Sequence, residues 1–343
     1  MTGAAVVVVG AGPAGAAAAL RLAQLGVRDV VLLDRADFPR DKTCGSGLSP
    51  RGIRTLRELG VWDAIVPHAY RVTGLRLVTP GGREAVVSGG ESAAAVVCLR
   101  RTLDLTLLER ARALGVEFVG GFTAQTLRCD GDRVAGVVSR DGREIAARWT
   151  IVADGAHSRL TVDGSPPRMM QAIMGWWEGA PVRAHHVEMV FDRLVTPGYG
   201  WLFPESATRV NIGVCYDDPR RERNARRVFE AFLDKHYAQR LRAAVPVGGL
   251  KGHPIAYTYR VGRLASPGRL VAGEAGRMVH PATAEGISQR VVCRGAALAR
   301  RRNVVGARPH RRRHTAARGQ DGARAAHGCD VMPTAGDGAV SGV

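Results

Sequence analysis

The sequence predicts an α/β fold: a three-layer, Rossmann-like domain, discontinuous in the chain, with an inserted β-rich lobe. Three observations support this prediction. Short apolar runs alternate with helical patterns over residues 1–165, starting from a continuous β-branched run at residues 5–9. Period-two alternation and clustered aromatic residues dominate residues 166–261. Residues 262–289 then return to the first domain.

The composition excludes several classes of protein. With 343 residues, 45% hydrophobic and 23% charged, the chain is long enough for two domains and too apolar to be disordered. Its six cysteines lack the spacing of a zinc site or a disulfide framework, so we expect no metal and a reducing, cytoplasmic location. The apolar stretch at residues 4–20 consists mainly of alanine, glycine and valine and contains Pro13, so we predict neither a signal peptide nor a membrane span.

The net charge of +18 is concentrated in part in the arginine-rich residues 290–343. This tail is low in complexity and has neither the period of a strand nor that of a helix. It is either a disordered basic arm or the out-of-frame translation of a GC-rich gene, and the abrupt change after Gln289 favours the second. We therefore expect no specific nucleic-acid partner, and a solvated face at residues 220–227. Peripheral contact with a membrane and the oligomeric state stay open.

The first 35 residues predict a site for a dinucleotide. The strand at residues 5–9 leads into a G-x-G-x-x-G turn and an alanine-rich helix. Without side chains, Gly10, Gly12 and Gly15 let backbone N–H groups at the positive end of that helix reach a pyrophosphate. Asp34 ends the second strand, at the spacing of an acid that binds ribose hydroxyls. An ordinary tight turn would not require that acid.

The elements that follow are predicted from apolar periodicity and turn residues. They are helices over residues 51–59 and 103–114, strands over 116–119, 125–127, 133–139 and 144–152, a turn over 129–132, and a hairpin over 75–87 around the turn at 80–82. The domain boundaries we expect are 1–75, 95–165 and 262–289 for the first domain, 76–94 and 166–261 for the lobe, and 290–343 for the tail.

Four separated motifs carry a resemblance to a known family. They are the glycine-rich unit with Asp34, FPRDKTCGSGLSP at residues 38–50, ADGAHS at residues 153–158, and GEAG at residues 273–276 followed by HP at 280–281 and EGI at 285–287. In order and spacing they resemble the flavoproteins of the p-hydroxybenzoate-hydroxylase-like fold, and within it the geranylgeranyl reductase family. The resemblance covers residues 1–289.

The resemblance implies FAD as the cofactor and NAD(P)H or a ferredoxin-like donor as the reductant. The FAD-binding positions it implies are Gly10, Gly12, Ala14, Gly15, Asp34, Arg35, Cys44, Gly45, Arg100, Asp154, Gly155, Gly273, Glu274, Pro281, Gly286 and Ile287. Arg100 or Arg101, just before the helix at residue 103, resembles the arginine that approaches FAD. A helix starting near Gly286 would stabilise the anionic reduced flavin by about 0.3–2 kcal/mol.

This chain departs from the family pattern at three places. Glu274 stands where the family has Asp, and Thr161 stands where an arginine is frequent. Beyond Ile287 the family continues with a long helix, whereas this chain continues with its irregular tail.

The resemblance also implies a substrate cavity. Tyr199, Trp201 and Phe203 lie on one face of a strand by period two and resemble the family's Y-x-W-x-F-P cavity wall, although such rings can also simply fill a core. Cys44 is the candidate catalytic residue, because a thiol beside a flavin can donate or relay a proton; a buried filler is the alternative.

The function that these motifs imply is FAD-dependent reduction of prenyl-chain double bonds in a small apolar substrate. One alternative is an FAD-dependent monooxygenase, a hydroxylase or epoxidase, of an apolar or aromatic metabolite. A second alternative is a truncated, inactive flavoprotein-like chain. The two enzyme classes share nearly all motifs because the redox chemistry belongs to the cofactor.

Overall fold

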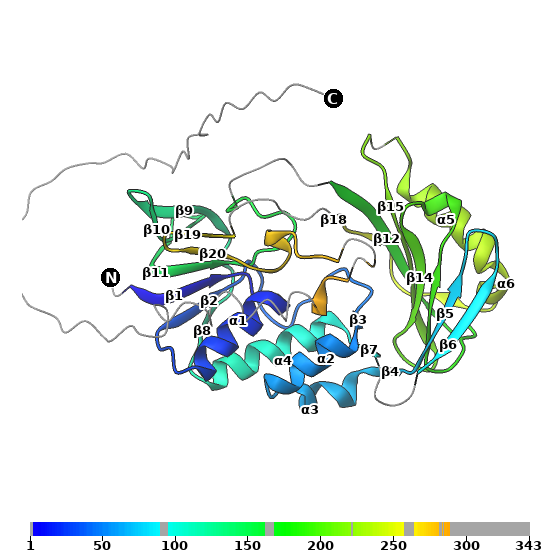
Figure 1. Cartoon of the computed structure of the whole chain (residues 1–343), viewed down its shortest axis with the longest axis horizontal. Coiled ribbons are helices and arrows are strands. Elements are labelled where there is room, and N and C mark those ends of the chain that lie inside the picture. The colour runs from blue at the N-terminus through cyan, green and yellow to red at the C-terminus, as the bar shows by residue number, and fades with distance from the viewer. Residues whose placement is uncertain are drawn as a thin grey trace, which may run out of the picture.

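The structure, a computed structural model, describes residues 3–89, 95–161, 168–220, 222–256, 264–280, 283 and 285–288. Within these residues the strands form an eight-stranded, a nine-stranded and a three-stranded sheet. Figure 1 shows the eight-stranded sheet at one end of the molecule and the nine-stranded sheet at the other, with helices and the small sheet between them. The chain passes between the two ends more than once, so the parts are interleaved in sequence.

The eight-stranded sheet is built around the N-terminal strand, β1. Its order is β19–β20–β11–β1–β2–β8, with β10 beside β11 and β9 beside β10, and β1 pairs in parallel with both neighbours. The strands are β1 (Ala4–Val9), β2 (Val30–Leu33), β8 (Glu117–Val119), β9 (Ala124–Asp130), β10 (Arg133–Ser139), β11 (Glu144–Val152), β19 (Ala265–Ser266) and β20 (Arg269–Val271). β9 continues to Asp130, so the turn after it is shorter than the predicted 129–132.

Both faces of this sheet are covered. On β1, Val6 and Val8 pack in a core with the helices, whereas Val7 and Val9 pack on the opposite face with Phe122. All four valines are at most 3% exposed. A strand made of continuous apolar residues needs a layer on each face, and the predicted three-layer α/β domain is confirmed.

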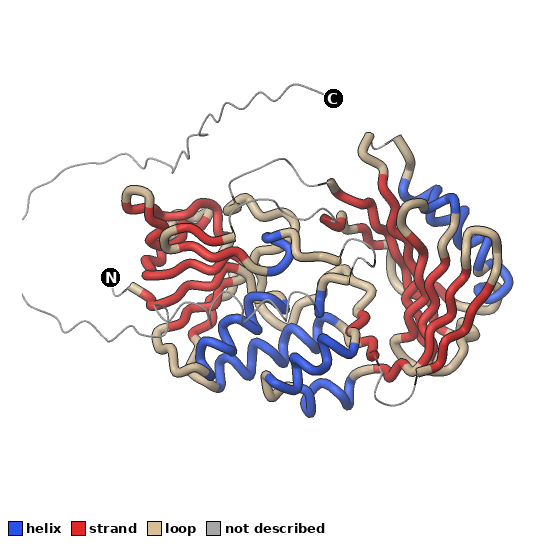
Figure 2. Tube along the Cα trace, in the orientation of Figure 1, coloured by secondary structure: helices blue, strands red, loops and turns tan. Residues whose placement is uncertain are grey.

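The larger helices of this domain gather on one face of the sheet (Figure 2). They are α1 (Pro13–Gln24), α2 (Pro50–Glu58), α3 (Trp62–Ile65) and α4 (Arg100–Ala113), with the 3₁₀ turns η1 (Val66–His68) and η4 (Gly273–Gly276) elsewhere in the domain. α4 begins at Arg100 rather than near residue 103, because the amides of Thr102 and Leu103 already donate to the Leu99 carbonyl. The expectation that Arg100 precedes the helix was therefore wrong, since it lies in the first turn.

Two further sheets complete the structure. The small sheet has the order β3–β7–β4, and the nine-stranded sheet has the order β16–β12–β15–β14–β13–β5–β6, with β17 and β18 beside β12. The strands are β3 (Gly47–Leu48), β4 (Tyr70–Val72), β5 (Gly74–Val78), β6 (Glu84–Ser88), β7 (Ala95–Val97), β12 (Met169–Glu178), β13 (His186–Val190), β14 (Tyr199–Pro204), β15 (Arg209–Asp217), β16 (Val245–Pro246), β17 (Lys251–Gly252) and β18 (Ile255–Ala256). β5 and β6 form the predicted hairpin.

Helices cover the outer face of the nine-stranded sheet (Figure 1). They are α5 (Ala225–His236) and α6 (Ala238–Leu241), with the 3₁₀ turn η3 (Arg193–Val195) beside α5. The sequence pattern predicted mainly strands in residues 166–261, and the helix α5 corrects that prediction. The Asn224 side chain caps this helix by accepting the Arg227 amide, and Phe229 and Phe232 are fully buried beneath it. Its buried positions, Val228, Phe229 and Phe232, follow the arginine-rich residues 220–227, for which a solvated face was expected.

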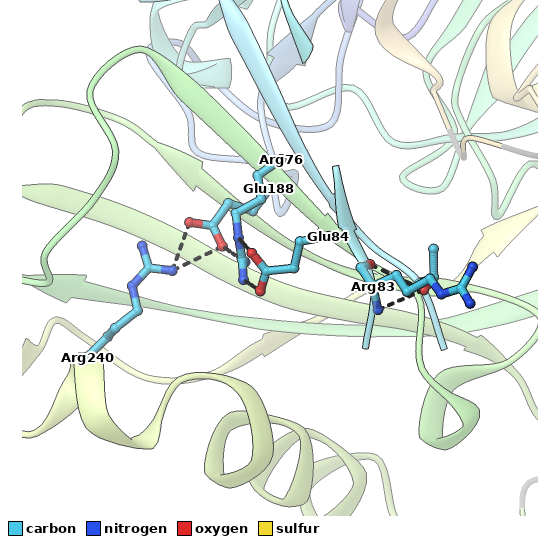
Figure 3. A network of polar contacts seen from close by, with 6 residues as sticks. Arg76, Arg83, Glu84, Glu188 and Arg240 are labelled. Atoms are coloured by element: carbon cyan, nitrogen blue, oxygen red, sulfur yellow. Dashed lines mark hydrogen bonds and ion pairs between the residues drawn. The ribbon is translucent and has the colours of Figure 1, made fainter. Parts of the chain in front are cut away.

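A buried carboxylate joins three elements on that outer face, as Figure 3 shows. The side chain of Glu188 on β13 is 3% exposed and accepts hydrogen bonds at 2.8 Å from Arg76 on β5 and from Arg240 on α6. Arg76 also pairs with Glu84 on β6. This network fastens the β5–β6 hairpin and α6 to the centre of the lobe.

No helix among the described residues is long and apolar enough to cross a membrane. The predicted tail at residues 290–343, and Gln289 before it, lie outside the described residues.

Candidate cofactor and substrate site

The glycine-rich turn closes tightly where β1 meets α1. Gly10 has a φ of 99°, and a Cβ atom there would lie 2.5 Å from the Ala153 carbonyl oxygen, just after β11. A Cβ atom on Gly15 would lie 1.8 Å from the Gly10 carbonyl oxygen. Glycine at these two positions therefore allows the turn and brings α1 close to the sheet.

Gly12 differs, because a Cβ atom there would clash with nothing and would make only ordinary van der Waals contacts. The atoms nearest to a Cβ built there are guanidinium nitrogens of Arg100, at 3.7 Å, and of Arg40, at 3.8 Å. Among the described residues no side chain caps the start of α1, so its first amides keep their hydrogen-bonding capacity. Amides, helix dipole and two guanidinium groups converge at this point, which is the chemistry that binds a diphosphate.

Asp104 on α4 holds both arginines in place. Its side chain is 1% exposed and accepts two hydrogen bonds from Arg100, at 2.8 and 2.7 Å, while Nη1 of Arg40 lies 3.1 Å from its Oδ2. Burial alone would lower the pKa of the Arg100 guanidinium, but Asp104 and the Cys44 side chain beside it raise that pKa. Arg100 is thus a buried, permanent cation beside the glycine turn.

Asp34 lies at the end of β2, beside the same turn. Its Oδ2 accepts the Ala11 amide at 2.9 Å, and its Oδ1 accepts the Ala36 amide at 3.0 Å. Nη2 of Arg40 lies 3.5 Å from Oδ2. The acid predicted from sequence spacing is therefore beside the glycine turn, and its bond to the Ala11 amide also closes that turn. Arg35, the next residue, is exposed.

Cys44 begins a loop that lies against the aromatic strand. Its sulfur is half-buried and accepts the Ser46 amide at 3.4 Å. A Cβ atom on Gly45 would lie 3.2 Å from Trp201 Nε1, and one on Gly47 would lie 3.1 Å from the Phe203 ring. Glycine at these positions lets the loop approach the rings closely.

A cavity of about 320 Å³ lies between this loop, the small sheet and the inner face of the nine-stranded sheet. Most of its walls are apolar, with contributions from Leu48, Val72, Val96, Val97, Met174, Val187, Met189 and Ile255. Cys44, Gly45, Arg100, Glu274, Gly286 and Ile287 also line it. The cavity therefore joins residues of the second and fourth motifs, although more than two hundred positions separate them in sequence.

The aromatic residues line this cavity as period two predicted. Tyr199, Trp201 and Phe203 all lie on its wall, along one face of β14. The Trp201 indole donates to Asn211 Oδ1 at 2.7 Å, and the Tyr199 hydroxyl donates to the Thr283 carbonyl oxygen at 2.5 Å. These bonds satisfy the polar atoms of both rings and leave apolar faces to the cavity.

The third and fourth motifs follow β11 and β20, the two strands next to β1 on one side of the sheet. Asp154 and Gly155 follow β11, and the Cα of Asp154 lies 2.9 Å from a Cβ built on Gly10. Gly273, with a φ of 66°, begins η4, and Glu274 follows it, 7% exposed. Ala14 is buried in α1, whereas Pro281 lies outside the described residues.

Ser288 ties the fourth motif to the second. Its Oγ accepts the Ser49 hydroxyl at 3.0 Å and the Ser49 amide at 3.3 Å. Ser288 is fully buried, and a Cβ atom on Gly52 would lie 2.5 Å from its Oγ. Position 52 in α2 is thus small because Ser288 lies against it.

Several residues of the site were not singled out from the sequence. They are Arg40, Asp104, Met174, Met189, His253 and Glu285. Asp104 follows Arg100 by one helical turn, and this i,i+4 pairing could have indicated it. No sequence pattern of this kind indicated His253. Burial and the nearby Lys42 lower the pKa of its imidazole.

These features define a class of protein. A glycine turn at the carboxyl ends of parallel strands is shaped for a diphosphate, and an apolar cavity opens beside it. This is the architecture of an enzyme that holds an extended dinucleotide, with its reactive end in a dry pocket.

Comparison with known proteins identifies the dinucleotide. The model of the FAD binding domain family matches residues 3–288. A menaquinone reductase of Mycobacterium tuberculosis is 39% identical over 228 residues, 61% of this chain and 54% of that protein. Digeranylgeranylglycerophospholipid reductase 2 of Methanopyrus kandleri is 32% identical, covering 84% of this chain and 74% of that protein. A geranylgeranyl bacteriochlorophyll reductase-like structure from Thermoplasma acidophilum matches with a TM-score of 0.75 at 21% identity, covering 84% of this chain and 75% of that one.

The chain therefore belongs to the FAD-binding domain family of oxidoreductases and to its geranylgeranyl reductase group, which confirms the resemblance found in the sequence. It spans about half the length of the menaquinone reductase that it matches.

Proposed function

We propose that the chain is an FAD-dependent reductase that saturates double bonds in the prenyl chain of a lipid, with NAD(P)H or a ferredoxin-like protein as its electron donor. The cavity of about 320 Å³ carries this proposal. Its apolar walls meet at the loop of Cys44 and at Gly286 and Ile287, where the resemblance places the flavin ring. Such a cavity suits a hydrocarbon chain and excludes the water that would compete for a hydride.

The names of the relatives support this substrate class. One is a reductase of menaquinone and another a reductase of digeranylgeranylglycerophospholipid. Both molecules are lipids with unsaturated isoprenoid chains. Their head groups differ, so the chain is the part that an enzyme of this group can recognise in both.

The residues beside the glycine turn fit the ADP half of FAD. The backbone at Gly12, with Ala14 in the first turn of α1 and the guanidinium groups of Arg40 and Arg100, would hold the diphosphate. Asp34 would accept hydrogen bonds from the ribose. Bound FAD supplies a two-electron carrier that can pass a hydride to carbon.

The cavity residues would hold the substrate. The faces of Tyr199, Trp201 and Phe203 would lie along the prenyl chain and position one double bond beside the flavin. Each ring that is covered by the chain removes apolar area from water, which favours binding. Cys44 is one candidate for the proton that completes the reduction.

The test uses the purified full chain with FAD. We expect a yellow protein that, once reduced by NADPH or dithionite without oxygen, converts a menaquinone or geranylgeranyl lipid into a product with two more hydrogen atoms per flavin oxidised. A colourless protein that takes up no FAD would contradict the proposal. A hydroxylated or epoxidised product that forms only in air would favour the monooxygenase.

A further inference from the structure

The sheet wall of the cavity contains one row of residues with a glycine inside it. Gly213 on β15 lies directly opposite Met174 on β12 and Trp201 on β14, and Met189 on β13 lies opposite Trp201 on the other side. Residues directly opposite each other in antiparallel strands project from the same face of the sheet. The two methionines and the tryptophan line the cavity, whereas Gly213 has no side chain to project.

The indole ring of Trp201 covers this bare position. A Cβ atom on Gly213 would lie 2.2 Å from Cζ2 of the ring and 2.6 Å from Cη2. Packed side chains do not approach so closely, so the ring occupies the space that a side chain at position 213 would need. The ring therefore extends from β14 across β15, with the sheet beneath it and the cavity on its other side.

Asn211 holds the ring in that position. Its side chain is fully buried, and its Oδ1 accepts the indole N–H of Trp201 at 2.7 Å. Its Nδ2 donates to the Gly175 carbonyl oxygen at 3.2 Å and lies 3.3 Å from Met174 Sδ. A buried hydrogen bond fixes the direction of a side chain, because breaking it leaves polar atoms without partners. Asn211 thus ties the ring to β12 as well as to β15.

The loop of Cys44 meets the same ring. A Cβ atom on Gly45 would lie 3.2 Å from Trp201 Nε1, and both residues line the cavity. The position of the ring therefore sets how much space stays open between this loop and the sheet. In the proposed function, the double bond that is reduced lies beside this loop.

The side chains on either side of Trp201 in the row are of a different kind. Met174 and Met189 are unbranched, with several rotatable bonds, and such side chains adapt to the shape of what they contact. The indole is rigid and has one hydrogen-bonded orientation. A rigid ring between two adaptable side chains suits a methyl-branched hydrocarbon, because the methionines can adjust to the branches while the ring keeps the chain in line.

We propose that Gly213 and Asn211 are positioning residues that determine which hydrocarbon chains the cavity accepts, an inference that rests on the proposed function. Gly213 leaves room for the indole against the sheet, and Asn211 keeps it there. Together they give the cavity the width that a methyl-branched prenyl chain needs beside the loop of Cys44. A side chain at position 213 would move the ring toward the cavity, because the backbone of the sheet blocks the opposite direction.

The test is Gly213→Ala in the FAD-loaded chain, with radiolabelled geranylgeraniol as the ligand in equilibrium dialysis. We expect the Kd for geranylgeraniol to rise at least about tenfold, because the displaced ring takes up space in the cavity. The Kd for FAD should stay within about twofold of its original value. A Kd for geranylgeraniol within about threefold of that of the unaltered chain would overturn the proposal.

The matched control is Gly200→Ala. Gly200 lies on β14 next to Trp201, and a Cβ atom there would lie 1.9 Å from Cζ of Phe232, beneath α5 on the outer face of the sheet. This variant introduces an equally close clash with an aromatic ring, so the free energy of unfolding should fall, but the Kd for geranylgeraniol should stay within about twofold. An equal loss of affinity in the two variants would mean general damage to the lobe and would overturn the proposal.

A double variant shows whether the ring causes the effect, also where Gly213→Ala alone folds poorly. Trp201→Leu removes the ring atoms that a side chain at position 213 would meet. In the Trp201→Leu background, adding Gly213→Ala should change the Kd for geranylgeraniol by less than about twofold. A tenfold loss in that background would overturn the role of the ring.

Asn211→Leu tests the hydrogen bond separately. The shape of the side chain is kept, but the indole loses its acceptor. Among the five tryptophans, the indole N–H of Trp201 is identified in NMR spectra by its absence in Trp201→Phe. We expect this N–H to exchange with heavy water at least about tenfold faster in Asn211→Leu, and the Kd for geranylgeraniol to rise at least about threefold. If either quantity stays unchanged, Asn211 does not position the ring.

Binding and turnover separate this inference from the proposed function. A chain that shows the expected changes in geranylgeraniol binding but reduces no prenyl lipid would overturn the proposed function and support the assignment of Gly213 and Asn211. A chain that reduces prenyl lipids, with the same KM for the lipid in Gly213→Ala, would overturn the inference alone.

Discussion

Two buried carboxylates of this molecule each bridge a pair of arginines, and only one of the two pairs faces the site. Asp104 joins Arg40 and Arg100 beside the glycine turn. On the outer face of the lobe, Glu188 joins Arg76 and Arg240 (Figure 3). The chemistry of the two clusters is nearly the same, but their surroundings differ.

In the lobe, both guanidinium groups also bind other neighbouring groups. Arg240 also donates to the Pro181 carbonyl oxygen at 2.8 Å, and Arg76 also pairs with Glu84. Beside the glycine turn, by contrast, a Cβ atom on Gly12 would meet only guanidinium nitrogens of Arg100 and Arg40, at ordinary contact distance. We therefore expect the arginine–carboxylate cluster beside the turn, and not the one on the lobe, to support binding of a ligand.

Asp104→Asn should give the largest effect. The replacement leaves Arg100 and Arg40 without their shared anion at a position where the side chain is 1% exposed. We expect the free energy of unfolding to fall by about 3–5 kcal/mol and the Kd for FAD to rise at least about tenfold. Urea unfolding and fluorescence titration with FAD measure the two quantities. If Asp104→Asn leaves the Kd for FAD unchanged, the two clusters do not differ in their effect on FAD binding.

Glu188→Gln should destabilise the chain without affecting the cofactor. Because Arg76 and Arg240 are 25% and 28% exposed, solvent compensates part of the loss, and we expect a decrease of about 2 kcal/mol in the free energy of unfolding. The Kd for FAD should stay within about twofold of its original value. A weaker FAD complex would show that the outer network reaches the site.

The ion pairs of Asp192 form another structural cluster of the lobe, and their contribution to the free energy of unfolding should depend on pH. Lys235 and His236 lie 2.7 and 2.9 Å from its Oδ2. Burial alone would raise its pKa, but hydrogen bonds from Lys235, the Leu194 amide and His236 lower it to about 2. Since this pKa lies below the ordinary 3.8, the stabilisation is complete above about pH 4 and is lost as the pH falls toward 2.

The expected loss between those pH values is about 2 kcal/mol. Unfolding free energies measured at a series of pH values, for the original chain and for Asp192→Asn, should therefore converge in acid. Curves that stay parallel would contradict the assignment to Asp192.

Glu84→Gln should have the smallest effect. Its side chain is 52% exposed and, among the residues that the structure describes, pairs only with Arg76, which keeps Glu188 as a second partner. We expect a change below about 0.5 kcal/mol in the free energy of unfolding. A larger value would mean that the network depends on its exposed end as much as on its buried one.

The parts of the fold that neighbouring residues determine could be predicted from sequence. The valine run, the glycine turn and Asp34 lie within one short segment, and local geometry sets their relation. The sequence also predicted that Tyr199, Trp201 and Phe203 share one face of their strand, because strand periodicity is a local property. The roles of the predicted site residues in binding and catalysis stay predictions that the proposed experiments address.

Features that depend on distant segments could not be predicted. The contact of Asp104 with Arg40 arises from packing between separate parts of the chain. The helix α5 was missed because it begins within an arginine-rich segment and lies in a region where strand patterns dominate. Glu285 belongs to a recognised motif, yet the motif does not reveal that one of its carboxyl oxygens is buried without a hydrogen-bond partner among the described residues.

The hydrogen bonds between Ser49 and Ser288 join segments that the ribosome synthesises at different times. A ribosome makes the glycine turn first and the last wall of the pocket almost three hundred residues later. Until Ser288 has emerged and folded back against α2, the cavity lacks the wall that Gly286 and Ile287 provide. We therefore expect a nascent chain halted before residue 286 to take up no FAD.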